Sequence, residues 1–223
     1  MKKVFSIFIS VIIMLSGFTA HAESNEFNIT VPDSFTVARK GDSLDGVARN
    51  LQMDTAKLSE YFSKNGLVYF AVSADTKTQV RLSEFSDNFS SQVVDICYLK
   101  ENELNEFIKA VGGENSNELV QNGSRKFVKI QSTLTDSGGD YTVTQYITIA
   151  NGKTYYLACY NEGSGESAQI NEIFKSFSLS SLQTAAEEMK VKMPWYIAGI
   201  ALFSVATAAG AIRVIISYKK SHQ

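Results

Sequence analysis

Histidine is almost absent from this chain of 223 residues. The two histidines are His21 and His222, and none lies between them. Ser-His-Asp and Cys-His catalytic sites need an imidazole as general base, and HExxH-type zinc sites need it as a ligand. Residues 23–192 also contain no Ser-x-x-Lys pair. The sequence therefore excludes these classes of enzyme from the long central part of the chain.

Cysteine is scarce as well. The only two are Cys97 and Cys159, and both lie in apolar segments that look like strands. In an exported domain two such cysteines can form a disulfide, provided that their Cα atoms lie within about 7 Å. Buried cysteines can equally act as small hydrophobic residues. A disulfide and two free thiols both remain open.

Acidic residues are missing from the first 22 positions. Two lysines precede an apolar run over residues 4–15, and a small-x-small pattern ends at Ala22. This order is typical of a cleaved export signal. The sequence predicts a signal peptide over residues 1–22.

Charged residues are missing from a second apolar run, over residues 194–212. Its length approaches the ~20 apolar residues that cross a bilayer. The sequence predicts a stalk over residues 180–193, a transmembrane helix over 194–217 and a cytoplasmic tail over 218–223. Aromatic rings and basic side chains favour the interfaces of such a span. The expected interface residues are Trp195, Tyr196, Arg213, Tyr218, Lys219 and Lys220.

The same apolar run contains one small-xxx-small pair, Ala206 and Gly210. This spacing lets two membrane helices approach closely. It indicates a possible weak homodimer through that face of the helix.

The part of the chain between the predicted signal and the predicted span is acidic. Residues 23–192 contain 16 basic and 23 acidic residues, a net charge of −7. An acidic domain should avoid nucleic acid, whose phosphates repel it. Residues 23–179 are long enough for one domain with its own core. We therefore expect a single extracytoplasmic domain on a cell-membrane protein, with its N-terminal side outside and its C-terminus in the cytoplasm.

Hydrophobic periodicity predicts an α+β domain whose antiparallel sheet is covered by helices. Asn151 and Gly152 form the strongest hairpin signal, between two alternating runs. Residues 114–123 look like a polar connector. Strands are expected over 27–31, 35–37, 67–73, 79–85, 93–99, 125–134, 141–150 and 153–160. Helices are expected over 44–51, 55–62, 104–111 and 168–177.

One fragment resembles the opening of a LysM peptidoglycan-binding module. Its letters are Phe35-Thr36-Val37, Gly41-Asp42-Ser43-Leu44, Val47-Ala48 and Leu58. Lys40 adds a residue to the pattern, and the closing Gly-x-x-Leu-x-Ile-Pro motif is absent. A capped amphipathic helix after a strand produces the same letters and is the preferred interpretation.

A broader resemblance covers the expected order of elements in the whole domain. It includes Tyr146-Ile147-Thr148-Ile149, then Asn151-Gly152-Lys153-Thr154-Tyr155-Tyr156-Leu157, and finally Ile173-Phe174-Lys175-Ser176-Phe177. This order resembles the PsbP-like superfamily. Residues 27–32 and 58–62 are similar to segments of exported proteins of Gram-positive bacteria. The resemblance implies a domain that binds proteins or ligands, and it supplies no shared catalytic residues.

These observations favour a non-enzymatic, membrane-anchored protein that binds a protein partner. We assign no catalytic residue, cofactor-binding residue or metal ligand. A peptidoglycan-binding protein is the first alternative, because of the LysM-like fragment. An enzyme that uses paired carboxylates is the second alternative, and it requires two acidic side chains that face each other in an apolar cleft.

Overall fold

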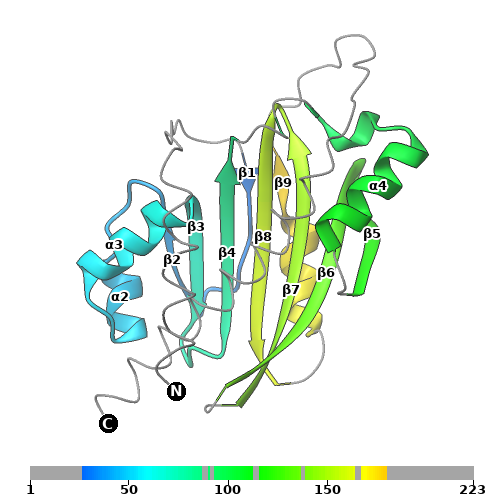
Figure 1. Cartoon of the computed structure of the whole chain (residues 1–223). Helices are drawn as coiled ribbons and strands as arrows, with labels where there is room; N and C mark the ends of the chain where they lie inside the picture. Colours follow the sequence, from blue (N-terminus) through cyan, green and yellow to red (C-terminus); the bar gives the residue numbers. More distant parts are fainter. Residues whose placement is uncertain are drawn as a thin grey trace, which may run out of the picture.

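A seven-stranded antiparallel sheet forms the centre of the domain (Figure 1). The computed structural model describes residues 27–86, 90, 93–112, 116–136, 139–163 and 167–179. In spatial order the strands are β2 (Phe35–Arg39), β3 (Leu67–Ser73), β4 (Thr78–Phe85), β8 (Lys153–Glu162), β7 (Gly139–Ala150), β6 (Arg125–Asp136) and β5 (Ser116–Asn122). The predicted α+β class with an antiparallel sheet is confirmed.

Two very short strands form a separate pair. They are β1 (Phe27–Asn28) and β9 (Ser178–Leu179), and Phe27 lies opposite Leu179. Nearby, the backbone N–H of Thr30 donates a hydrogen bond to Ser176 Oγ at 2.9 Å. These contacts join the first and last described segments of the domain.

Two helices cover the β2 and β3 end of the sheet, α2 (Asp45–Leu51) and α3 (Thr55–Lys64) (Figure 1). The carboxylate of Asp54 accepts hydrogen bonds from the backbone N–H groups of Ala56 and Lys57, which fixes the start of α3. Leu58 and Phe62 are buried on the inner face of α3. The periodicity of the sequence predicted both helices because their apolar positions face one side only.

Gly66 joins α3 to β3 in a conformation that suits glycine. Its φ is +57°, and a Cβ atom there would lie 2.8 Å from the backbone oxygen of Glu84. The N–H of Glu84 donates a hydrogen bond to the Gly66 carbonyl at 2.9 Å. The turn therefore brings the end of the helix directly against β4.

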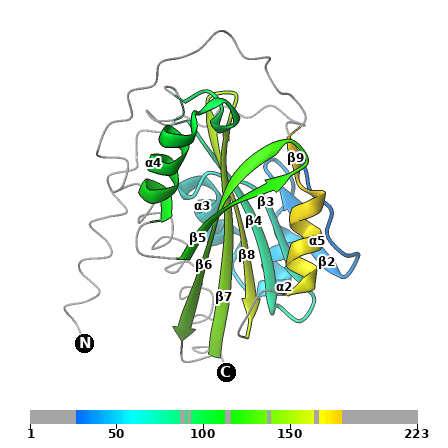
Figure 2. The ribbon, with the colours of Figure 1, turned by 90° about the vertical axis from the view of Figure 1, so that its right-hand side faces the viewer.

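Helix α4 (Glu101–Gly112) covers the other end of the same sheet face, and α5 (Ala168–Ser176) covers the opposite face (Figure 2). The inner side of α4 packs on β6 and β7 in a cluster with Val128 and Ile147. The ring of Phe174 on α5 stacks on Tyr146 at 3.8 Å between centroids. The sheet is thus buried on both faces, which its long apolar strands require.

The chain turns from β7 to β8 at the predicted hairpin. Asn151 and Gly152 both have positive φ, 52° and 71°. Two adjacent residues of this kind form a turn whose twist matches that of the flanking strands. The hairpin prediction is confirmed.

Two local predictions are wrong. Residues 93–99, expected as a strand, contain the 3₁₀ helix η2 (Ile96–Tyr98), because Asp95 accepts a hydrogen bond from the Cys97 N–H and caps a turn instead. The expected connector over 114–123 contains the edge strand β5. A polar edge strand lacks the apolar alternation of a half-buried strand, so periodicity did not reveal it.

Several predictions fall outside the described residues. These are the signal peptide 1–22, the stalk 180–193, the span 194–217, the tail 218–223, the six interface residues and the pair Ala206 and Gly210. Among the residues that the structure describes, no helix has the length and apolar character of a membrane span. The membrane topology of the chain, with its signal peptide, transmembrane span and cytoplasmic tail, stays a prediction.

Candidate functional site

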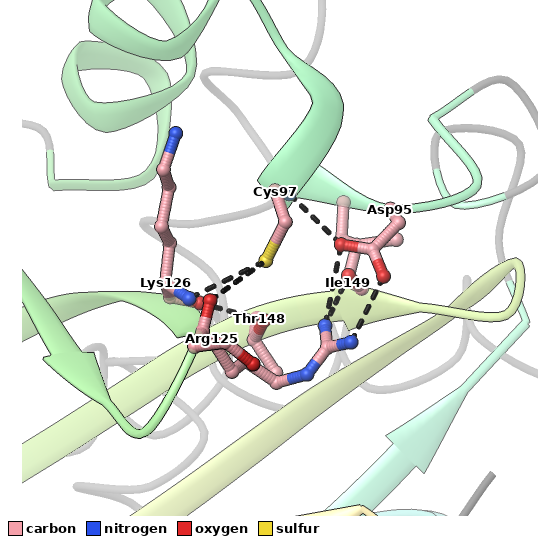
Figure 3. A network of polar contacts seen from close by, with 7 residues as sticks. Asp95, Cys97, Arg125, Lys126, Thr148 and Ile149 are labelled. Atoms are coloured by element: carbon pink, nitrogen blue, oxygen red, sulfur yellow. Dashed lines mark hydrogen bonds and ion pairs between the residues drawn. The ribbon is translucent and has the colours of Figure 1, made fainter. Parts of the chain in front are cut away.

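A buried ion pair connects η2 to the sheet (Figure 3). Arg125 Nη2 donates to Asp95 Oδ2 at 2.9 Å, and Nη1 donates to Asp95 Oδ1 at 3.3 Å and to the Ile149 carbonyl at 3.2 Å. Both side chains are buried. Because Asp95 and Arg125 neutralise each other and connect η2 to the sheet, we interpret this ion pair as a structural clamp.

Cys97 lies beside this clamp (Figure 3). Its sulfur accepts a hydrogen bond from the Lys126 N–H at 3.4 Å and lies 3.9 Å from the Ser124 carbonyl oxygen. Burial raises the pKa of the Cys97 thiol. A thiol with a raised pKa is a poor nucleophile, because the thiolate is the reactive form.

Cys97 and Cys159 do not form a disulfide with each other in the structure. Cys159 belongs to the core under α5, whereas Cys97 sits on η2, which packs on the α4 side of the sheet. The sheet therefore separates them.

Acidic and metal-ligating groups are dispersed over the described ranges. In those ranges no three His, Cys, Asp or Glu side chains gather where they could hold a metal ion. The buried carboxylate of Asp95 is already paired with Arg125.

The LysM-like letters lie mainly in β2, α2 and α3. Val47, Ala48 and Leu58 are buried with Phe70 and Val72 in one apolar cluster. Their spacing is explained by packing of the two helices on β2 and β3.

A group of buried residues that includes three polar side chains is not explained by helix packing. It lies on the middle strands, between the helices α3 and α4 (Figure 1). We call it the Arg81 strip. Its members are Gln79 and Arg81 on β4, Ala158 and Tyr160 on β8, and Val143 and Gln145 on β7.

The strand register places these side chains on one face of the sheet. Arg81 lies opposite Phe70 on β3 and opposite Ala158 on β8. Ala158 in turn lies opposite Gln145 on β7. Directly opposed residues of neighbouring strands point to the same face. Arg81, Ala158 and Gln145 therefore form one row across three strands.

Arg81 is a buried cation, and the described side chains that contact its guanidinium are neutral. Its side chain is 3% exposed. Nη1 donates to Tyr61 Oη at 2.6 Å, and Nη2 donates to Gln79 Oε1 at 2.6 Å. The guanidinium lies 4.3 Å from the ring centroid of Tyr160 and 5.3 Å from that of Phe70. Among the described residues no carboxylate forms an ion pair with it.

Two polar atoms of the strip are buried without a hydrogen-bond partner. They are Arg81 Nε, a donor, and Gln145 Oε1, an acceptor. Gln145 is also 3% exposed. A buried polar atom without a partner costs about 1–3 kcal/mol, and more if it is charged. Such atoms are rare in folded proteins and mark places where a partner is missing.

The tyrosines around the strip stay neutral. Burial raises the pKa of Tyr61, an effect that the nearby Arg81 charge partly offsets. Burial likewise raises the pKa of Tyr160. Neither phenol therefore supplies the negative charge that Arg81 lacks at neutral pH.

Alkaline unfolding tests the burial of the tyrosines directly. Tyr69, on the other sheet face, has its pKa raised by burial to about 12, against about 10 in an unfolded chain. Because the unfolded state loses its proton first, stability should be constant below pH 10 and fall between pH 10 and 12, by at most about 1.4 kcal/mol per pH unit for one tyrosine.

Urea unfolding at pH 8, 10 and 11 measures this fall. Tyr69→Phe should reduce the slope, while Tyr98→Phe, at an exposed position, should leave it unchanged. An identical slope for Tyr69→Phe and the unmodified chain would contradict the prediction.

Sequence reasoning missed the Arg81 strip. The sequence does contain one indication of the strip: Gln79, Arg81 and Gln145 are polar residues inside runs that otherwise favour strands. A single polar residue in a strand normally indicates the solvent face. Only the structure shows that these three side chains are buried.

Comparisons with known proteins assign no relationship. No family model matches the chain, and no curated protein sequence matches it. A crystal structure from Bacteroides thetaiotaomicron is 16% identical with a TM-score of 0.44, over 70% of this chain and 46% of that one. The chain thus spans about half the length of that protein.

The extracellular domain of PknH from Mycobacterium tuberculosis is 10% identical, with a TM-score of 0.23 over 74% of this chain and 86% of that one. At TM-scores below 0.5, neither likeness assigns a family or a function. The resemblance to the PsbP-like superfamily stays a prediction from the sequence.

Proposed function

We propose that residues 23–179 form a non-catalytic binding domain, held outside the cell membrane by the segment 194–217, and that its ligand binds at the Arg81 strip. The single observation that carries this proposal is the buried guanidinium of Arg81, which has no acidic partner among the described residues. The expected non-enzymatic character rests on the absence of histidine between residues 22 and 221.

The free-energy cost of burying the Arg81 charge supports a binding role for the strip. Removal of a charged side chain from water costs several kcal/mol unless a counter-ion and hydrogen bonds compensate. Tyr61 and Gln79 supply neutral acceptors only. In the same domain Arg125 has a carboxylate partner on the neighbouring turn. Because Arg125 has a carboxylate partner and Arg81 has none among the described residues, we expect a ligand to supply the anion that pairs with Arg81.

Thermal unfolding of the full chain in mild detergent tests the proposal. A ligand that binds only the folded state raises the melting temperature. Acetate, succinate and inorganic phosphate should be compared with uncharged acetamide at equal ionic strength. We expect one or more of the anions to stabilise the chain by several degrees at saturation and acetamide to have no effect.

Matched variants locate the effect. Arg81→Gln should abolish the stabilisation by the anion, whereas Lys64→Gln, which removes a charge from an exposed ion pair, should retain it. Equal anion responses of Arg81→Gln and the unmodified chain would overturn the assignment of the strip. Retention of the Arg81→Gln chain on purified peptidoglycan would instead favour a glycan-binding surface elsewhere.

A further inference from the structure

We infer that the Arg81 strip binds the carboxy-terminal residue of a peptide: Arg81 binds the terminal carboxylate, and Gln145 accepts the amide N–H of the same residue. This inference rests on the proposed function and names its ligand. It arises from two unsatisfied atoms of opposite type, Arg81 Nε and Gln145 Oε1.

The positions of Arg81 Nε and Gln145 Oε1 limit the spacing between the polar groups of the ligand. Arg81 and Gln145 stand on β4 and β7, with only Ala158 of β8 between them in the row. Neighbouring strands lie about 4.8 Å apart, so the two backbones are separated by roughly 10 Å. Both side chains are long and Ala158 is short. A ligand that contacts both atoms must therefore present an acceptor and a donor that are only a few atoms apart.

The charge of the strip favours a carboxylate over a phosphate. Arg81 is its one cation, and the residues that contact the guanidinium are Tyr61, Phe70, Gln79 and Tyr160. A carboxylate neutralises this single charge, whereas a phosphate leaves excess negative charge in a buried place. The planar guanidinium also matches the geometry of a carboxylate.

The donor of the ligand must be neutral. A free amino acid would place its ammonium group beside Arg81, and among the described side chains of the strip there is no acid to balance it. An amide N–H satisfies Gln145 Oε1 without a second positive charge. A peptide terminus carries this amide and the carboxylate on one Cα atom. Val143, Ala158 and Tyr160 pack as an apolar cluster beside them, which suits a small apolar terminal side chain.

Calorimetric titration of the full chain in detergent with N-acetyl-alanyl-alanine tests the inference. The two matched ligands are its C-terminal amide, which lacks the carboxylate, and free alanine, which carries an ammonium group. We expect the acid to bind at least tenfold more tightly than either of them. This comparison uses the unmodified chain, so it does not depend on whether a variant folds.

Variants then assign the two contacts. Arg81→Gln should abolish binding of the acid, and Gln145→Leu should weaken it about tenfold while leaving the response to acetate unchanged. Gln121→Leu, at an exposed position on the edge strand, serves as the control. Equal affinity of the Gln145→Leu and unmodified chains for the peptide would overturn the role of Gln145.

The outcomes separate this inference from the proposed function. Binding of acetate or succinate without preference for the blocked peptide would overturn the inference and keep the function. Binding of none of these ligands would overturn both. The L,L and D,D forms of the peptide identify the source, since tighter binding of the first indicates a protein terminus and tighter binding of the second a cell-wall stem peptide.

Discussion

Replacement of Asp95 by alanine should lower the free energy of unfolding by about 3–5 kcal/mol. The carboxylate accepts two hydrogen bonds from Arg125 and one from the Cys97 N–H. Asp95 and Arg125 are each 7% exposed. The substitution leaves the Arg125 cation buried with one remaining acceptor, the Ile149 carbonyl. It also removes the cap of η2.

Urea unfolding of the Asp95→Ala chain measures this loss. The control is Glu172→Ala, which breaks the exposed ion pair with Lys175 and should change stability by less than about 1 kcal/mol. The double variant Asp95→Leu with Arg125→Met should recover much of the loss, because it leaves no unpaired charge. A loss below 1 kcal/mol for Asp95→Ala would show that the ion pair of Asp95 with Arg125 does not hold η2 to the sheet.

Replacement of Phe127 by alanine should be about equally severe, at about 3–5 kcal/mol. Phe127 on β6 is 1% exposed. Its ring contacts Phe174 on α5 edge-on, at 5.2 Å between centroids, and Phe177 just beyond α5 at 5.8 Å. Truncation leaves a cavity beneath α5 and removes two aromatic contacts. Because β1 pairs with β9 directly after α5, the loss should also loosen this end of the domain.

Hydrogen exchange and urea unfolding together measure the Phe127→Ala effect. Amides of α5 should exchange faster, whereas amides of α3, on the opposite face, should change only with the global stability. Leu119→Ala, at a position 40% exposed on the edge strand, is the matched control. Unchanged exchange in α5 would contradict the role of Phe127 in holding this helix.

Much of the fold follows from local patterns. The helices α2, α3, α4 and α5 were predicted because their apolar positions recur at helical spacing. The hairpin at Asn151 and Gly152 was predicted because two positive φ angles are required there. Both signals act between residues that are close in sequence, so a sequence alone reports them.

The elements that were missed depend on distant partners. The strand β5 exists because its backbone pairs with β6, and because Asn122 Nδ2 donates hydrogen bonds to the carbonyls of Phe174 and Phe177, about fifty residues away. Residues 96–98 form η2, whose local cap by Asp95 is held against the sheet by the ion pair of Asp95 with Arg125, 30 positions away. Local periodicity contains no information on such contacts.

The candidate site depends on tertiary structure entirely. Arg81, Gln145 and Ala158 come from three strands and meet only through the register of the sheet. By itself the sequence determined the absence of histidine and the acidic character of the central segment, since both are properties of composition. Only the tertiary structure decided which polar side chains are buried without partners, because burial and hydrogen bonding arise from neighbours that the fold brings together.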